Sequence, residues 1–369
     1  MFLYTVFNIG CALSPTITGL LLCRLISGTA AASPLTNSGG VLTDIWPIDR
    51  LGIPMALFSL APFLGPVLGP ICGGFITQYA GWQWIYYVLI IFGFVCWVLV
   101  IIALPETFGP TILERRAKKL RKQTGDNRYQ SVSEKSRPPI GQILSVSLTR
   151  PFRLLFTEPI VIFSSIYVAI VYGILYMSFE MYPLEFQGQH HMQLGVSGLA
   201  FISIGIGLLL SFVTTSLFDI RYQKKLRAIG RRPDAEERLL PAIFVGGPCF
   251  AISLFWFAWT SYPWIHWMAP MASGVLLGLG VVIIFTSFLS YLADAYVIFA
   301  ASALAANTIS RSILGAVFPL FVRQMFEGMT IKWAATLLAI IVTILIPIPV
   351  IFYKKGAAIR SRSTFAKSS

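Results

Sequence analysis

A series of apolar blocks constrains this chain more than any other feature. Several blocks reach about 20 residues, the length that a helix needs to cross a bilayer. Of the 369 residues, 56% are hydrophobic and only 12% are charged, with a mean hydropathy of +0.76. A soluble domain carries about a quarter charged residues. We therefore expect an all-α integral membrane protein, without the alternating strands of an outer-membrane barrel.

The blocks predict ten membrane spans. The first block is short for a complete crossing, because Pro15 closes it. The approximate ranges of the spans are 1–14, 20–43, 54–76, 82–103, 159–182, 194–218, 240–260, 265–291, 296–322 and 332–352.

Basic residues are concentrated in three polar segments. Residues 105–157 contain eleven Lys or Arg, 221–238 contain seven and 353–369 contain five, out of 28 in the chain. All three segments fall on one side if the ten spans alternate, and the positive-inside rule makes that side cytoplasmic. The net charge of +13 is then explained by topology and by anionic lipid headgroups, and no nucleic acid is needed to explain it.

The same pattern divides the chain into four parts. We expect residues 1–104 to form the remnant of an N-terminal bundle with four spans, and 158–353 to form a bundle with six. Residues 105–157 read as a basic cytoplasmic linker, with a short surface helix followed by a flexible segment. Residues 354–369 form a basic cytoplasmic tail.

The third span contains the sequence GPVLGPICGG. Gly65, Gly69 and Gly73 recur every four residues and so form one stripe on a helix. In lipid, helices associate through close backbone contact, which small residues permit. Pro66 and Pro70 each remove a backbone hydrogen bond. The pattern predicts a kinked helix packed against a neighbour, at a hinge between two bundles; ordinary small-residue packing is the alternative.

The order Gly69-Pro70-x-x-Gly73-Gly74 resembles the antiporter motif of the major facilitator superfamily, which lies in the fifth helix of drug:proton antiporters. The longer family pattern has a glycine where this chain has Ala56. Further stretches resemble the same family in order. CRLISGTAAA, with Arg24, is similar to its fourth-helix motif, and the stretch YLADAYVIFAASALAANTISRSILGAVFPLF is similar to fungal polyamine and cycloheximide-resistance exporters.

The resemblance implies a twelve-helix bundle, of which the ten spans would be helices three to twelve. The first two helices of the family would then be missing from this chain. The implied function is secondary active transport: proton-coupled efflux of a small organic drug, polyamine or secondary metabolite by alternating access. A truncated, non-transporting membrane protein from a partial gene model and an uptake symporter of the same fold are the alternatives.

Charged groups inside the spans are candidates for proton coupling. Glu180 is the best candidate for a carboxylate that alternately binds a proton or a cationic substrate, and an interfacial position is its alternative. Glu185 is expected to be interfacial. Arg24 stays charged, so we expect it to bias a nearby carboxylate or else to extend to the headgroups.

Aromatic and amide side chains supply further candidates for substrate contact. Tyr172 and Tyr176 lie four residues apart on one helix face, where their rings suit cation–π contact with ammonium groups, and packing is the simpler role for either alone. Asn37 and Asn307 are polar groups within spans, which either line a cavity or bridge helices.

Gates are expected at the cytoplasmic edges. Asp44 precedes the third span in LTDIW, and Asp294 precedes the ninth in LADAY. Arg50 and Arg311 are the corresponding basic candidates. Arg311 is too far along the chain to pair with Asp294 on one helix, so Asp294 is expected to cap a helix or to bridge to a basic loop residue.

Several function classes are excluded by what the sequence lacks. It has no Gly-x-x-x-x-Gly-Lys-Ser/Thr loop for ATP and no readable catalytic set, so we expect no enzyme and no cofactor. His190 and His191 are too isolated for a metal site. We expect a monomeric multi-pass protein of the plasma membrane that contacts lipid, protons and a small-molecule substrate.

Overall fold

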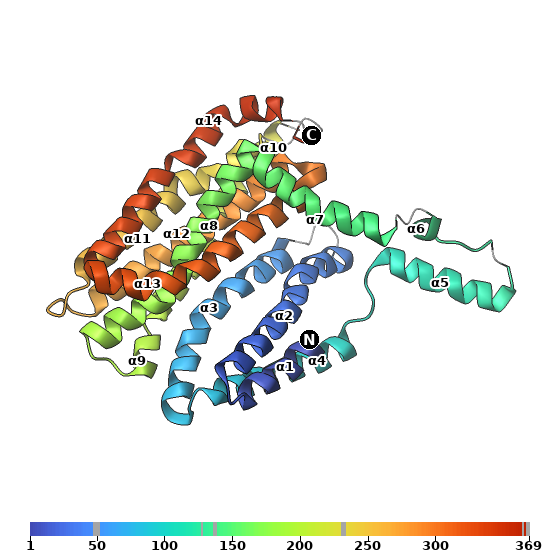
Figure 1. The fold of residues 1–369 in the computed structure, drawn as a ribbon. Helices are drawn as coiled ribbons and strands as arrows, with labels where there is room; N and C mark the ends of the chain where they lie inside the picture. The colour runs from blue at the N-terminus through green and yellow to red at the C-terminus, as the bar shows by residue number, and fades with distance from the viewer. Residues whose placement is uncertain (47–51, 127, 136–138, 230–233, 364, 367–369) are drawn as a thin grey trace. The chain divides into compact units, whose positions relative to one another are not determined.

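The computed structural model describes the chain apart from residues 47–51, 127, 136–138, 230–233, 364 and 367–369. Every regular element in the described residues is helical, in agreement with the all-α prediction (Figure 1). The chain divides into two compact units. The first comprises Met1–Gly65 and Cys72–Gln142, and the second comprises Pro66–Ile71 and Ile143–Ser369.

The first unit begins with four apolar helices, in which α1 packs against both α2 and α4. Thr16 caps α2, because its hydroxyl accepts a hydrogen bond from the Gly19 backbone N–H at 3.3 Å. Gly81 adopts a φ of +92° in the turn between α3 and α4, a conformation that glycine tolerates best. The bounds are α1 Phe2–Leu13, α2 Ile17–Ile45, α3 Gly52–Ala80 and α4 Gln83–Ala103.

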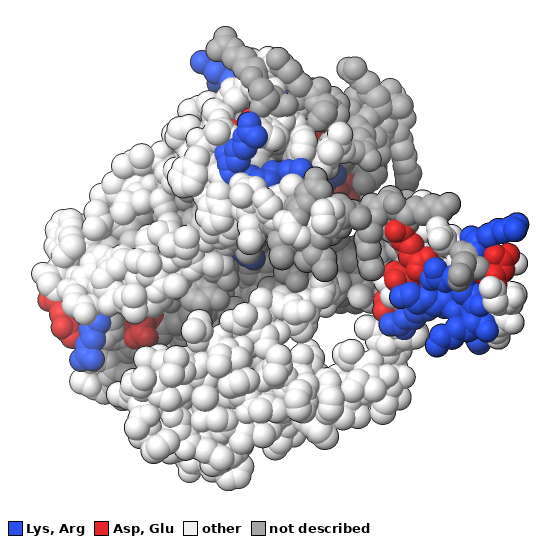
Figure 2. Space-filling model, turned by 45° about the vertical axis from the view of Figure 1, so that its right-hand side comes forward, with Lys and Arg blue, Asp and Glu red and all other residues white. Residues whose placement is uncertain are grey.

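The linker contains more helix than the sequence led us to expect. It holds α5 (Gly109–Thr124), α6 (Val132–Lys135) and α7 (Ile140–Thr157). The prediction of a flexible segment after the surface helix is wrong for α7, whose apolar residues recur at helical spacing. Basic side chains gather over α5 in Figure 2, whereas the surface of the apolar helices in that view is largely uncharged.

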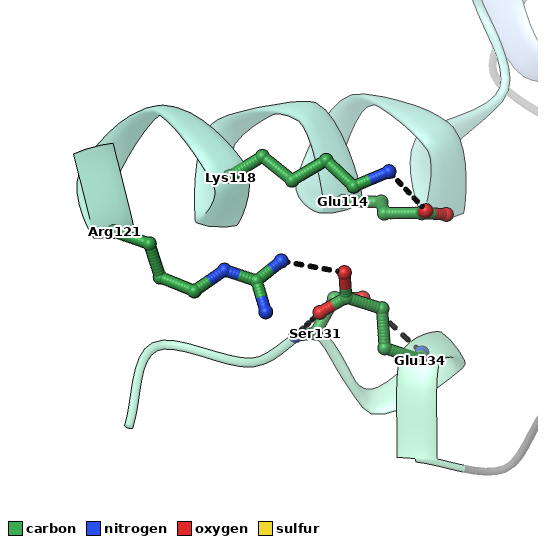
Figure 3. Close-up of polar contacts among 5 residues, drawn as sticks. All are labelled: Glu114, Lys118, Arg121, Ser131 and Glu134. Atoms are coloured by element: carbon green, nitrogen blue, oxygen red, sulfur yellow. Dashed lines mark hydrogen bonds and ion pairs between the residues drawn. The ribbon is translucent and has the colours of Figure 1, made fainter. Parts of the chain in front are cut away.

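A capping box organises the connection from α5 to α6 (Figure 3). The Glu134 backbone N–H donates to Ser131 Oγ at 3.3 Å, and Glu134 Oε2 accepts from the Ser131 N–H at 3.2 Å. Arg121 donates to Glu134 Oε1 at 2.7 Å, while Lys118 pairs with Glu114 at 2.9 Å. The hydrogen bond from Arg121 lowers the pKa of the Glu134 carboxyl below its ordinary value of 4.5.

The second unit is a bundle in which α8 packs against α13, α10 against α12, and α11 against both α12 and α13. Its core is apolar and aromatic, with Tyr167, Phe250 and Phe288 fully buried. The bounds are α8 Pro159–Pro183, η2 Leu184–Gln189, α9 Leu194–Gly198, α10 Phe201–Ile229, η3 Ala235–Leu239, η4 Ala242–Gly246, α11 Gly247–Thr260, α12 Met268–Ala295, η5 Val297–Phe299, α13 Ala300–Leu345 and α14 Pro347–Arg362.

Seven helical stretches among the described residues are long and apolar enough to cross a membrane. One of them, Val297–Ser361, contains both the ninth and the tenth predicted spans. Phe2–Leu13 is apolar but shorter, as expected for the first block, and α3 covers the third span. The stretch between the ninth and tenth predicted spans is mostly helical, because α13 continues to a kink at Thr330, whose φ is 66° and ψ 156°.

Close helix contact through small residues occurs in the second unit, between α10 and α12. A Cβ added at Gly278 would lie 2.3 Å from the Ile204 carbonyl oxygen, and one at Gly207 would lie 2.1 Å from the Val275 carbonyl oxygen. Any side chain at either position would force the two backbones apart. The α10–α12 contact therefore depends on these two glycines.

Replacement of Gly278 by alanine should destabilise the protein by about 1–3 kcal/mol, the usual cost of overpacking. The thermal unfolding of the purified protein in detergent would measure the loss. Gly328→Ala is the matched control, because a Cβ at Gly328 meets no described atom within 4 Å. Equal unfolding temperatures for the two variants would contradict the backbone contact.

The Glu134 pKa provides a second prediction. Because the folded pKa is lowered, the contact with Arg121 stabilises the linker above the ordinary pKa of 4.5 and is lost as the pH falls through the lowered value. Arg121→Gln should return the Glu134 pKa toward 4.5, as measured by the carboxyl carbon chemical shift during a pH titration. Lys119→Gln removes the same charge from α5 and should leave the titration unchanged; an equal effect of both variants would refute the contact.

Candidate functional site

A polar cluster lies inside the second unit, where α8 faces α13. The Tyr172 hydroxyl donates to the Tyr176 hydroxyl at 3.2 Å, and the two ring centroids are 4.8 Å apart. The face of α13 has a glycine here, and a Cβ at Gly315 would lie 3.0 Å from the Tyr172 ring. The predicted tyrosine pair is therefore formed, with one ring pressed against the backbone of α13.

Arg311 lies against this pair. Its guanidinium carbon is 5.1 Å from the centroid of the Tyr172 ring and 4.7 Å from that of Phe285 on α12. Arg311 follows the start of α13 by eleven residues, or about 16 Å along the helix axis at 1.5 Å per residue. The expected position at the cytoplasmic edge is therefore wrong: Arg311 lies in the interior of the span, among aromatic rings.

No carboxylate of a described residue forms an ion pair with Arg311, although Arg323, farther along the same helix, pairs with Glu327 at 2.9 Å. Aromatic faces compensate only part of the cost of removing a guanidinium from water. None of the hydrogen bonds between described side chains involves the Arg311 guanidinium, so its donors face the aromatic rings instead.

Asn307 stands one helical turn before Arg311, on the same face of α13. It is fully buried, and neither its oxygen nor its nitrogen has a hydrogen-bond partner within the part of the chain that the structure describes. Leaving a buried amide unsatisfied costs about 1–3 kcal/mol. Asn307 therefore adds a donor and an acceptor to the face of α13 that carries Arg311.

A second cluster, centred on Arg238, joins the elements η3, α10 and α12 of the second unit. Arg238 of η3 donates to Asp294 at 2.9 Å, pairs with Asp219 at 3.2 Å, and lies over the Tyr222 ring at 3.8 Å. These residues, apart from Asp294, line a cavity of about 320 Å³. Asp294 thus bridges to a basic residue between spans, one of its two expected arrangements, while its role as a gate stays a prediction.

The candidates in the first unit are spread over separate contacts. Arg24 is exposed and lies 5.7 Å from the centroid of the Tyr86 ring, and Asn37 donates to Ser33 Oγ at 3.3 Å. Asp44 accepts a hydrogen bond from Thr107 at 3.4 Å. Arg50 lies outside the described residues.

The glycine- and proline-rich segment forms part of one uninterrupted helix, α3. No described heavy atom lies within 4 Å of a Cβ built at Gly65 or Gly69, and a Cβ at Gly73 meets only Ile85, at 3.9 Å. The three glycines therefore make no close contact with described residues, but the segment does pack against a neighbour, because a Cβ at Gly198 of α9 would lie 2.6 Å from the Pro70 carbonyl oxygen. The hinge role of the segment, with Pro66, Pro70 and Gly74, stays a prediction.

The two carboxylates at the end of α8 differ from what we expected. Glu180 is exposed, whereas Glu185 is fully buried in η2, so the prediction of an interfacial Glu185 is wrong. The His190 Nε2 atom lies 3.3 Å from Glu185 Oε1. Sequence reasoning missed this pair because the π-helical turn that directs Glu185 inward has no clear sequence signal.

Comparison with known proteins agrees with this architecture. The model of the Major Facilitator Superfamily matches residues 1–319. A solved structure of a POT family transporter in complex with a thioalcohol-conjugated peptide superposes with a TM-score of 0.67, at 12% identity, over 96% of this chain and 80% of that one. At such low identity the match concerns the fold alone.

Curated fungal relatives match nearly the whole chain. The transporter paaT of Penicillium rubens is 45% identical over 99% of the chain, and the efflux pump FUB11 of Gibberella moniliformis is 42% identical over 98%. The multidrug transporter mdrA of Aspergillus fumigatus is 44% identical over 99%. The chain spans 67%, 61% and 60% of the lengths of these three relatives.

The helical spans and the matched family model describe a multi-pass membrane protein. The chain belongs to the major facilitator superfamily.

Proposed function

We propose that the chain is a secondary active transporter that exports small organic compounds in exchange for protons. The observation that carries this proposal is the cluster of Tyr172, Tyr176, Asn307 and Arg311, with its unused hydrogen-bonding groups inside a membrane bundle. Relatives named an efflux pump and a multidrug transporter support export as the direction and organic compounds as the substrates.

The cluster narrows the class of substrate. We expected the tyrosine faces to bind ammonium groups, but Arg311 of the chain itself lies against the Tyr172 ring. A polyamine would meet this positive charge at short range. Of the drugs, polyamines and secondary metabolites that the sequence allows, we therefore favour drugs or secondary metabolites that offer hydrogen-bond acceptors and an apolar body.

Aromatic rings next to the cluster can contact such an apolar body. The Tyr176 and Phe179 ring centroids are 5.4 Å apart, and Phe179 stacks on Phe201 at 5.5 Å. Aromatic rings offer a large apolar contact area to a bound compound without requiring one fixed orientation of that compound. This arrangement supports a site that tolerates several related compounds.

The basic segments support an orientation with the linker and the C-terminal tail in the cytoplasm. In this orientation, the Arg238 cluster lies at the cytoplasmic end of the second unit and η2 at the outer end. We place the protein in the plasma membrane as a monomer.

Arg311→Gln should lower the export of Nile red, a neutral amphipathic dye, by roughly tenfold, because it removes a charged hydrogen-bond donor worth about 1.5 kcal/mol. Arg311→Lys keeps the charge but loses the planar fork, so its export should be intermediate. The rate of dye loss from preloaded cells of a drug-sensitised yeast strain provides the measurement. Lys354→Gln, which removes a positive charge elsewhere, is the control. Equal rates of dye loss for Arg311→Gln and Lys354→Gln would show that the cluster takes no part in export.

Proton coupling predicts that a protonophore abolishes this export. Glu180→Gln should also abolish the dye export that depends on the proton gradient, because glutamine cannot carry a proton. Normal export by Glu180→Gln would show that Glu180 does not carry the coupled proton. No export by the unmodified chain, at normal expression in the membrane, would favour the alternative of a non-transporting fragment.

A further inference from the structure

The buried contact between Glu185 and His190 lies outside the polar cluster of α8 and α13. Glu185 belongs to the π-helical turn η2, and none of its side-chain surface is exposed. Its Oε1 atom lies 3.3 Å from His190 Nε2, but the geometry there is not that of a hydrogen bond. Both Glu185 oxygens and His190 Nε2 therefore lack a hydrogen-bond partner in the described residues.

Few titratable or polar groups surround this contact. His191 follows His190 with a φ of 51°, and His266, from the segment before α12, acts electrostatically on His190. From the end of α11, Ser261 lies close enough to Glu185 to influence it, although its hydroxyl donates to the Phe257 carbonyl at 2.8 Å.

Two further polar groups, on α8 and α13, do not neutralise the carboxylate. The Tyr182 hydroxyl, on α8, is buried and has no hydrogen-bond partner among the residues described. Lys332, on α13, lies over the Trp259 ring, 4.0 Å from its centroid, and forms no ion pair with Glu185. The only cation available to Glu185 at ion-pair distance among the described residues is thus His190 in its protonated form.

Burial therefore requires at least one proton on the pair. An ionised carboxylate with no cation and no hydrogen bond is strongly disfavoured in a protein interior. With one proton, the pair is either a neutral carboxylic acid beside a neutral imidazole or a carboxylate beside an imidazolium, and both states remove the isolated charge. Loss of that proton would leave an uncompensated anion in the bundle.

We propose that Glu185 and His190 form a proton-binding site of the transporter, in which His190 connects Glu185 to the water at the proposed outer end. The His190 side chain keeps 10% of its surface exposed, whereas Glu185 has none. A proton taken from water by His190 passes to Glu185: the N–H bond at Nε2 breaks as the O–H bond at Oε1 forms. The proton returns to water by the same steps in reverse order, from Glu185 to His190 and then to water.

The surroundings of His190 favour this transfer. Burial, together with the charges of His266 and His191, lowers the His190 pKa, so the imidazole gives up its proton readily. This inference rests on the proposed proton-coupled export, for which it identifies a second protonatable carboxylate, five residues beyond Glu180 in the chain.

Infrared spectroscopy tests the proton site without any transport. The carbonyl band of a protonated carboxylic acid should be present in the purified 369-residue chain near neutral pH and should be lost in Glu185→Gln. In a titration between about pH 5 and pH 8, the range in which histidine changes its charge, His190→Gln should shift the pH at which this carbonyl band disappears. Glu327→Gln, which removes an exposed carboxylate of α13, is the matched control and should leave the band intact. A band unchanged in Glu185→Gln would overturn the proposal.

Transport into vesicles tests whether the Glu185–His190 pair couples dye movement to the proton gradient. In Glu185→Gln vesicles, Nile red movement driven by a pH gradient should fall at least tenfold, whereas the exchange of labelled for unlabelled dye without a gradient should persist. Persistent exchange shows that the variant folds and binds the dye; Glu185→Asp, which keeps a carboxylate, should recover part of the gradient-driven flux. Gradient-driven flux equal to that of the unmodified chain would overturn the coupling role.

The two proposals fail in different ways. Absence of gradient-driven flux in the unmodified chain would refute the proposed function and, with it, the coupling role of the pair. The infrared result would then decide separately whether Glu185 binds a proton.

Discussion

Hydrocarbon solvates apolar side chains about as well as a neighbouring helix does, so the second unit depends on how closely its backbones approach. The contact of α10 with α12 at Gly207 and Gly278 supplies that approach. It also fixes α12, which carries Phe285 toward Arg311. The aromatic surrounding of the arginine therefore depends on two positions that have no side chain, one on α10 and one on α12 itself.

Polar groups in such a bundle are costly, and their places are informative for this reason. Several buried serine hydroxyls of the second unit donate to a carbonyl one turn earlier on their own helix, as Ser178 and Ser253 do. Asn307 and Glu185 have no such bond. They lie in two separate regions, one beside the arginine and tyrosines and one beside a histidine, which agrees with separate sites for the organic compound and for the proton.

The sequence predicted the parts of this arrangement that follow from composition and local spacing. Apolar length located the spans, and a spacing of four residues paired Tyr172 with Tyr176. It grouped Arg311 with the gate residues at the cytoplasmic edge, although the predicted span 296–322 already contained the residue. The burial of Glu185 was also missed, because it depends on a π-helical turn, and α7 was missed because a Ser- and Pro-rich stretch precedes it.

The joint between the linker and the second unit has a mechanical consequence. Only Glu158 separates α7 from α8, and its carboxylate accepts a hydrogen bond at 3.0 Å from Tyr296, the residue after α12. The joint is therefore stiff and is anchored to a second transmembrane helix. A displacement of α7 is therefore passed on to α8, the helix that carries Tyr172 and Tyr176, because no flexible connection lies between them.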